Sequence, residues 1–169
     1  MLENVFSTLS TTPDKLRREL RDFSPREMKR RPAPGKWSVQ EVLAHLADVE
    51  RYGMRGRVEA IVTQQRPLLE PFDQEKRAAE LRYDRIDPRQ SLDSLVRQRR
   101  ANVKWLRTLR PAQLRRVGVH PQVGEVSALD YLHEWAFHDL GHLKQVLEIK
   151  RYALFPHMGN TRKFYNFGS

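Results

Sequence analysis

Two histidines one helical turn apart, His138 and His142, are the residues of this chain whose type and spacing most directly suggest chemistry. Their segment, 127–152, starts with a Ser-x-x-Asp capping box and carries apolar residues at helical spacing, Leu140 and Leu147 among them, which predicts a helix with a buried face. Residues four apart project from nearly the same side of a helix. Two such imidazoles can bind one metal ion when a third ligand comes from another helix.

The candidate third ligand is His45. It follows a second capping box, Ser38-Val-Gln-Glu41, which starts a helix expected to run to about residue 62. His45 shares an inward-facing stripe with apolar residues of that helix. A single buried histidine is more often a hydrogen-bonded core residue than a ligand. Three inward imidazoles from two helices instead favour a metal site with open positions, as catalytic sites have.

Nearby carboxylates are candidates for supporting roles. Glu134, one turn before His138, is the candidate catalytic base or hydrogen-bond acceptor, although such a residue is more often a solvated surface carboxylate. Asp48, one turn beyond His45, is a candidate fourth ligand or a partner of a ligand. Asp139 is rotated by about 100° from its neighbour His138, so it is not expected to bind the metal.

Four long amphipathic segments are expected to position these side chains. The first comprises the helical stretches 3–10 and 13–22, with Pro13 in the first turn of the second stretch, and the others cover 38–62, 87–109 and 127–152. The connections between them, rich in Pro and Gly, read as loops. The predicted fold is an all-α four-helix bundle with long crossover connections, in one domain over 1–169. Residues 153–169 are expected to form an irregular C-terminal extension.

The same patterns predict which large and charged side chains are buried. Trp135 and Tyr52 are expected in the core, because large aromatic residues are readily buried. The charged residues Glu41, Glu50, Arg51 and Arg55 are expected mostly on the outer face of the second long helix. Apart from the histidines, the side chains expected inside the bundle are therefore apolar.

Composition restricts the classes of protein considered. The 169 residues hold 31 Lys and Arg against 21 Asp and Glu, a net charge of +10, but no Cys. Disulfides, thiolate ligands and a cysteine nucleophile are thereby excluded. The basic residues are spread along every helix without a nucleic-acid-binding motif, so nucleic acid is not the expected partner. No apolar run is long enough for a membrane span, and no secretory signal is present, so the expected location is cytoplasmic.

Two segments, KWSVQEVLAHLADVE (36–50) and HPQVGEVSALDYLHEWAFHDLGHLKQV (120–146), resemble the DinB-like superfamily of metal-binding bundle proteins. The resemblance rests on Trp37-Ser38-Val39 at a helix start, on His45 within that helix and on the distant His138-Asp139-x-x-His142. It implies a four-helix bundle, commonly a homodimer, in which the three histidines hold a divalent metal. Zinc, nickel, iron and manganese are all metals that the resemblance allows.

The resemblance also implies a class of activity. Several relatives use low-molecular-weight thiols in transfer or isomerisation, so the first hypothesis is a metal-dependent enzyme performing thiol-dependent transfer or hydrolysis on a small molecule. A three-histidine cation can activate water or a thiol by lowering its pKa. The alternative hypothesis is a non-catalytic, stress-associated protein that binds a metal or nucleic acid.

Overall fold

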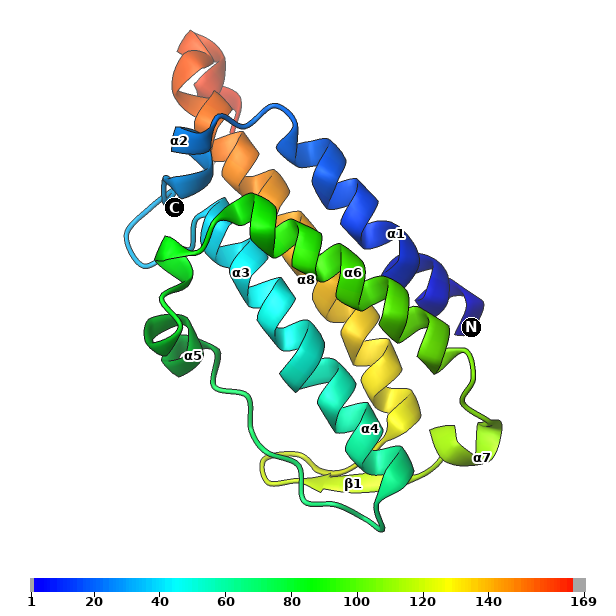
Figure 1. Ribbon diagram of the computed structural model, residues 1–169. Coiled ribbons are helices and arrows are strands. Elements are labelled where there is room, and N and C mark those ends of the chain that lie inside the picture. The colour runs from blue at the N-terminus through cyan, green and yellow to red at the C-terminus, as the bar shows by residue number, and fades with distance from the viewer. Residues whose placement is uncertain (1, 166–169) are drawn as a thin grey trace.

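Four long helical segments form the body of the protein, which its computed structural model describes over residues 2–165 (Figure 1). They are α1 (Leu2–Leu20), α3 (Val39–Val49) with its continuation α4 (Gly56–Thr63), α6 (Pro88–Leu106) and α8 (Ala128–Leu154). A π-helical turn, η1 (Glu50–Arg55), joins α3 to α4 without a break. The predicted four-helix bundle is confirmed.

The order of the helices around the bundle differs from their order in the chain. α1 packs against α8 and α6, and the α3–α4 rod packs against the same two helices. The ring therefore reads α1, α6, α3–α4, α8, with α1 opposite α3 and α6 opposite α8. Since α3–α4 and α6 run in the same direction, the chain must return along the length of the bundle between them (Figure 1). This return is one of the predicted crossover connections.

Short elements lie within the connections. The first connection contains α2 (Pro25–Lys29), and the returning segment contains α5 (Gln74–Glu80) and the 3₁₀ turn η2 (Tyr83–Arg85). Between α6 and α8 the chain forms α7 (Pro111–Leu114) and an antiparallel hairpin of β1 (Val117–His120) and β2 (Gly124–Ser127). This hairpin corrects the prediction of loops alone. Strands of four residues are too short to show a clear alternating pattern.

Capping fixes the start of the two helices that carry the histidines. Ser38 accepts a hydrogen bond from the Glu41 N–H and Glu41 accepts one from the Ser38 N–H, so the capping box of α3 is complete. Ser127 and Asp130 form the same reciprocal pair at the start of α8. Such boxes satisfy two backbone donors that a helix end leaves unpaired. Both helix starts were therefore predictable from local sequence.

Pro13 lies inside α1, which corrects the prediction of a new helix starting there. A proline has no N–H for the carbonyl four residues earlier, here that of Leu9. The guanidinium of Arg99 on α6 donates to this Leu9 carbonyl at 2.8 Å. A hydrogen bond from another helix thus replaces the one that proline removes, and α1 continues.

The two aromatic residues expected in the core differ in burial. Trp135 is only 1% exposed and packs in the larger of two apolar clusters that fill the bundle. Tyr52 is 55% exposed, so its predicted burial is wrong. Its ring lies on the outer face of η1 between the guanidinium groups of Arg51 and Arg77, at 5.1 and 5.0 Å from the ring centre. Cation–π contacts stabilise it there without burial.

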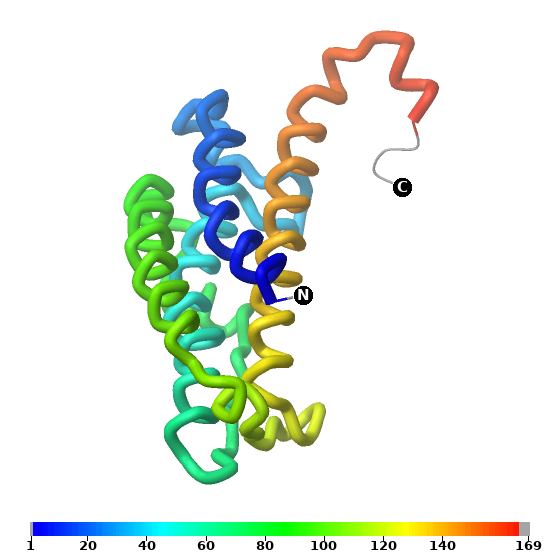
Figure 2. The backbone as a smooth tube through the Cα atoms, turned by 90° about the vertical axis from the view of Figure 1, so that its right-hand side faces the viewer, coloured from blue at the N-terminus to red at the C-terminus, as the bar shows by residue number. Residues whose placement is uncertain are grey.

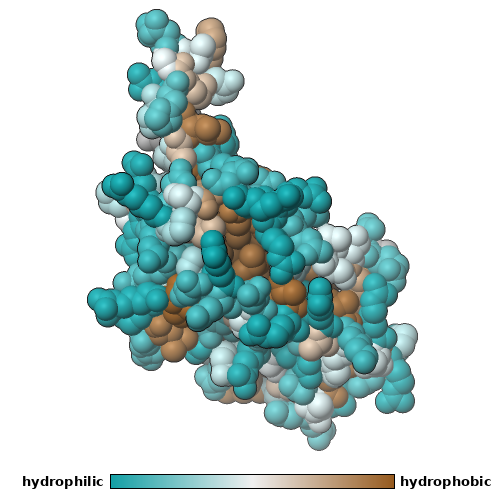
Figure 3. Space-filling view, turned by 45° about the horizontal axis from the view of Figure 1, so that its top comes forward, coloured by the Kyte–Doolittle hydropathy of each residue, from teal (hydrophilic) through white to brown (hydrophobic). Residues whose placement is uncertain are grey.

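The C-terminal end of α8 projects beyond the other helices (Figure 2). Two 3₁₀ segments follow it, η3 (Phe155–His157) and η4 (Gly159–Phe164), so this part of the predicted irregular extension is helical. Residues 166–169 lie outside the described part of the chain. Hydrophilic side chains cover most of the face seen in Figure 3, with apolar atoms between them. No helix within residues 2–165 is both long and apolar enough to cross a membrane.

Candidate metal centre

The three predicted histidines meet between α3 and α8. The Nε2 atom of His138 lies 3.1 Å from the Nε2 of His45 and 3.1 Å from the Nε2 of His142. One ring nitrogen from each of the three lies within 4.8 Å of the other two. His138 and His142 stand one turn apart on α8, and His45 reaches them from α3. The convergence predicted from the sequence is confirmed.

The spacing of these nitrogens fits a shared cation. Two ligands that are each about 2.0–2.1 Å from one tetrahedral zinc ion lie about 3.3 Å apart. The observed Nε2 separations are close to that value. Imidazole ligands also suit nickel, copper and iron, so the donor set does not select one metal.

The protonation state of the rings also fits a cation. Burial lowers the pKa of His45 to about 2, with further lowering by His142 and His138. Burial likewise lowers the pKa of His138 to about 3, and His142 and the Arg99 cation add to that effect. Burial lowers the pKa of His142 as well. At neutral pH the three rings are therefore uncharged, and uncharged imidazole is the form that binds metals.

One hydrogen bond and several ring contacts orient the imidazoles. The Nδ1–H of His142 donates to Oε1 of Gln145 at 2.8 Å, which leaves the Nε2 lone pair directed to the centre. The His45 ring packs against the rings of Trp37, Phe72 and Tyr83, with centroids 5.1 to 6.3 Å apart. The Nδ1 atoms of His45 and His138 are buried without a hydrogen-bond partner in the described structure.

The three histidines differ in their burial. His45 is 1% exposed, whereas His138 and His142 are only half-buried. A site with three protein ligands and an accessible face has room for a further ligand, as catalytic zinc sites do. A purely structural site would be closed by a fourth protein ligand.

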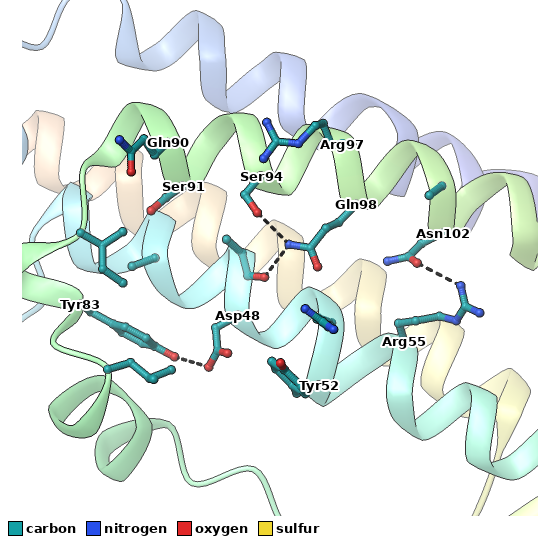
Figure 4. Close-up of a pocket in the computed structure, with 16 residues that line it drawn as sticks. Asp48, Tyr52, Arg55, Tyr83, Gln90, Ser91, Ser94, Arg97, Gln98 and Asn102 are labelled. Atoms are coloured by element: carbon teal, nitrogen blue, oxygen red, sulfur yellow. Dashed lines mark hydrogen bonds between the residues drawn. The ribbon is translucent and has the colours of Figure 1, made fainter.

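Asp48 does not supply that fourth ligand, which corrects one of the two roles predicted for it. Its carboxylate accepts two hydrogen bonds from the Arg77 guanidinium, both at 2.6 Å. It also accepts one from the Tyr83 hydroxyl at 2.6 Å (Figure 4). Burial and the bond to Asp48 raise the pKa of Tyr83. Asp48 also lines a groove of about 780 Å³ over the outer face of α3 and α6, and no histidine lines that groove. Asp48 therefore supports the Tyr83 ring beside His45.

A buried ion network next to the histidines was not predicted. Arg99 of α6 donates to Glu50 at 2.8 and 2.9 Å and to Asp139 at 2.9 Å. Glu50 also accepts from Asn102 at 2.8 Å and from Trp135 Nε1 at 3.0 Å. The side chains of Arg99, Glu50 and Asp139 are at most 3% exposed. The prediction that Glu50 lies outside is therefore wrong. It is also wrong for Glu41, which is 4% exposed and held in the capping box of α3.

The sequence did contain a signal for this network. In helical projection, Glu50 falls between the directions of two buried residues, Leu43 and Leu46. Arg99 likewise lies four residues after Leu95 and seven before Leu106, in the apolar stripe of α6. Charged residues inside an apolar stripe indicate a buried pair. Arg51 is exposed, as predicted, and Arg55 is half-buried with its guanidinium 3.6 Å from the Trp105 ring centre.

Glu134 lies in a second cleft, of about 550 Å³, beside the centre. It is exposed, one turn before His138 on α8. Phe72 lines the same cleft and packs edge-on against the His45 ring, with centroids 5.9 Å apart. Phe72 can come this close to the rod because of Gly53: a Cβ there would lie 3.3 Å from the Phe72 ring and 2.4 Å from the Val49 side chain. None of the three metal-site histidines is among the residues that line the cleft, and Phe72 is the residue that links its wall to the His45 ring.

The fold and the site together define a helical bundle with an open three-histidine centre suited to a divalent metal. The DinB superfamily matches residues 8–146, and the chain belongs to this superfamily. OB0782 of Oceanobacillus iheyensis, named as a probable metal-dependent hydrolase, is 29% identical over 152 residues, which are 88% of this chain and 86% of that protein.

Solved structures show the same fold. YfiT of Bacillus subtilis, described as a probable metal-dependent hydrolase with an unusual four-helix bundle topology, superposes with a TM-score of 0.81 at 23% identity, over 88% of this chain and 85% of that one. A mycothiol-dependent maleylpyruvate isomerase superposes with a TM-score of 0.67 at 14% identity, over 86% of this chain and 60% of that one.

Proposed function

We propose that this protein is a metal-dependent hydrolase that acts on a small molecule at the three-histidine centre. The observation that carries the proposal is the convergence of the uncharged Nε2 atoms of three histidines, two of which are only half-buried. Relatives named as metal-dependent hydrolases support it. The accessible face also favours catalysis over a purely structural metal, which is the alternative role.

The histidines and Gln145 form the metal-holding part of the site. His45, His138 and His142 would hold the ion, and Gln145 would fix the ring of His142. A divalent cation at this position supplies a Lewis acid that polarises a substrate oxygen and lowers the pKa of water. The proposal allows zinc, nickel, iron or manganese as that cation.

Glu134 is the proposed general base. It stands one turn from His138 on the wall of the cleft, where its carboxylate can take a proton from an attacking water. The half-buried faces of His138 and His142 leave the reacting groups accessible to substrate. The ordered rings around His45 keep the opposite side of the centre free of solvent.

The nucleophile distinguishes hydrolysis from thiol-dependent transfer. If a low-molecular-weight thiol attacked in place of water, the same groups would catalyse transfer of the thiol. An assay with and without added thiol separates the two reactions.

Assembly as a homodimer, and a small molecule rather than nucleic acid as partner, stay predictions. Gel filtration with light scattering tests the first of these.

The test of the proposed base is the variant Glu134→Gln. It should lower kcat on small esters, amides or phosphoesters by about 10²–10⁴-fold, because the base is lost while the metal ligands are kept. Metal content by mass spectrometry should equal that of the wild type. Glu148→Gln, a change of another carboxylate on α8, is the control and should retain full activity. An unaltered kcat in Glu134→Gln would remove Glu134 from the mechanism.

A further inference from the structure

A fourth histidine, His120, lines the cleft that contains Glu134, although the sequence pattern gave it no role. It ends strand β1 and is 8% exposed. Its Nδ1 accepts a hydrogen bond from the Gln122 backbone N–H at 3.3 Å. An uncharged imidazole whose Nδ1 accepts must carry its proton on Nε2. Within residues 2–165, the bond from Gln122 is the hydrogen bond that the His120 ring makes, so its Nε2–H is free to donate to a ligand in the cleft.

Arg57 provides a positive charge on the same cleft. Its Nε and Nη2 donate to the Glu70 carbonyl at 3.3 and 2.8 Å, which holds the side chain in place. The guanidinium lies over the Tyr131 ring, 5.5 Å from its centre. An arginine held in this way loses little conformational entropy when it binds an anionic oxygen.

The positions of Glu134 and Tyr131 along α8 show which end of the cleft is nearer to the three histidines. Glu134 precedes His138 by one turn, and Tyr131, under Arg57, precedes His138 by seven residues, about 10 Å along the axis at 1.5 Å per residue. The end nearer the histidines holds the proposed base. The far end holds a cation and lies in the same cleft as the His120 donor.

From this arrangement we propose that His120 and Arg57 bind an anionic group of the substrate, a carboxylate or a phosphate, while its scissile bond lies at the histidine centre. The inference rests on the proposed function for the identity of the reacting end. It narrows the substrate class to small molecules that carry an anionic group a few bonds away from the bond that is cleaved. His120 is then a substrate-binding residue and not a metal ligand.

Two substitutions of His120 separate the donor from a structural role. In His120→Asn the side-chain oxygen can replace Nδ1 as acceptor for the Gln122 N–H, but nothing replaces Nε2. In His120→Gln the longer side chain can place an N–H close to the position of Nε2. A merely structural histidine would tolerate Asn at least as well as Gln, whereas a ligand-binding donor requires Gln. His157→Asn, in the exposed C-terminal segment, is the matched control.

The experiment is calorimetric titration of the zinc-loaded protein with succinate, with inorganic phosphate and with uncharged succinamide. Wild-type protein should bind at least one of the two anions, and succinamide more weakly. His120→Asn and Arg57→Gln should each weaken anion binding by about tenfold to a hundredfold, as expected for loss of a hydrogen bond to a charged group. His120→Gln should stay within about threefold of the wild type, and His157→Asn and the exposed Arg89→Gln should be unchanged. Comparing the two anions shows whether a carboxylate or a phosphate fits.

Two results would overturn the inference: anion affinity unaltered in His120→Asn, or succinamide affinity equal to that of the more tightly bound anion. Zinc content measured on the same samples keeps the two proposals apart. If the wild type retains no zinc, the proposed function fails, while the titration still tests the cleft, because its donors belong to the chain. If zinc is retained but neither anion binds, only the present inference fails.

Discussion

Two buried polar clusters lie next to each other on α8 and are built in opposite ways. In the first, Arg99 joins Glu50 and Asp139, and every charge has a partner on another helix. In the second, which contains the next residue along the chain, His138, the His138 ring contacts those of His45 and His142. The buried Nδ1 atoms of His45 and His138 have no hydrogen-bond partner among the described residues. Both clusters link the rod of α3, η1 and α4 to its neighbours, so position in the bundle does not explain the difference.

The difference shows which cluster serves the fold and which serves a ligand. Buried charges are tolerated when they are paired and hydrogen-bonded, and the Arg99 network meets that condition with protein groups alone. In the histidine cluster three Nε2 atoms converge, the buried Nδ1 atoms of His45 and His138 have no protein partner, and two of the residues are only half-buried. The first cluster therefore holds the helices together, and the second is available for a cation.

Removing Arg99 should have the largest effect of the changes considered. Arg99→Met leaves the Glu50 and Asp139 carboxylates buried without their cation and also removes the donor to the Leu9 carbonyl. The expected loss is about 3–5 kcal/mol in the free energy of unfolding. Urea denaturation measures it, with the exposed neighbour changed in Arg100→Met as control. A loss below about 1 kcal/mol would show that the network is not structural.

The next effect concerns the orientation of a ring in the other cluster. Gln145→Leu removes the acceptor for Nδ1–H of His142 but keeps all three metal ligands. Loss of such a partner should lower metal affinity by about 10–100-fold. Competition with a chromogenic chelator measures the affinity, and the unfolding curve of the metal-free variant should match that of the wild type. Equal metal affinity would mean that the His142 ring needs no such support.

The third effect is a dependence of stability on pH in the metal-free protein. His45 and His138 have pKa values near 2 and 3 when folded, below the usual value near 6.5. As the pH falls below 6.5, these histidines become protonated in the unfolded chain but stay uncharged in the folded one. Their contribution to the free energy of unfolding is therefore complete above pH 6.5 and is lost progressively toward pH 3.

Between pH 7 and pH 5 each of these histidines should cost about 2 kcal/mol of stability. The variant His45→Leu should lack its share, so the loss over this range should be about 2 kcal/mol smaller than in the wild type. Urea denaturation with a chelator at both pH values gives the comparison. Parallel pH profiles would show that His45 is not held uncharged by burial.

The sequence predicted those parts of the site that depend on local spacing. The i, i+4 pair at His138 and His142, the capping boxes that place both helices and the stripe containing His45 are all read from short segments. For the same reason the four-helix bundle was predictable. The three histidines needed only that α3 and α8 face each other.

The parts that were missed depend on contacts between distant segments. Glu50 and Arg99 are 49 residues apart, and each alone resembles a solvated surface charge. Asp48 was assigned to the metal centre because Arg77, 29 residues later, could not be placed beside it. The proposed substrate-binding role of His120 depends on the position of the hairpin beside α8 and the loop of Phe72, which together line the cleft. Spacing within one helix carries no information about such partners.

The most direct test of the three-histidine centre is X-ray absorption spectroscopy of the zinc-loaded protein, with metal content measured in parallel for His45→Ala and His142→Ala. The account predicts three imidazole nitrogens at about 2.0–2.1 Å from one ion. It also predicts that both variants lose most of their zinc under conditions in which the wild type retains one ion per chain. Unchanged zinc content in both variants, or a shell without imidazole, would contradict the account.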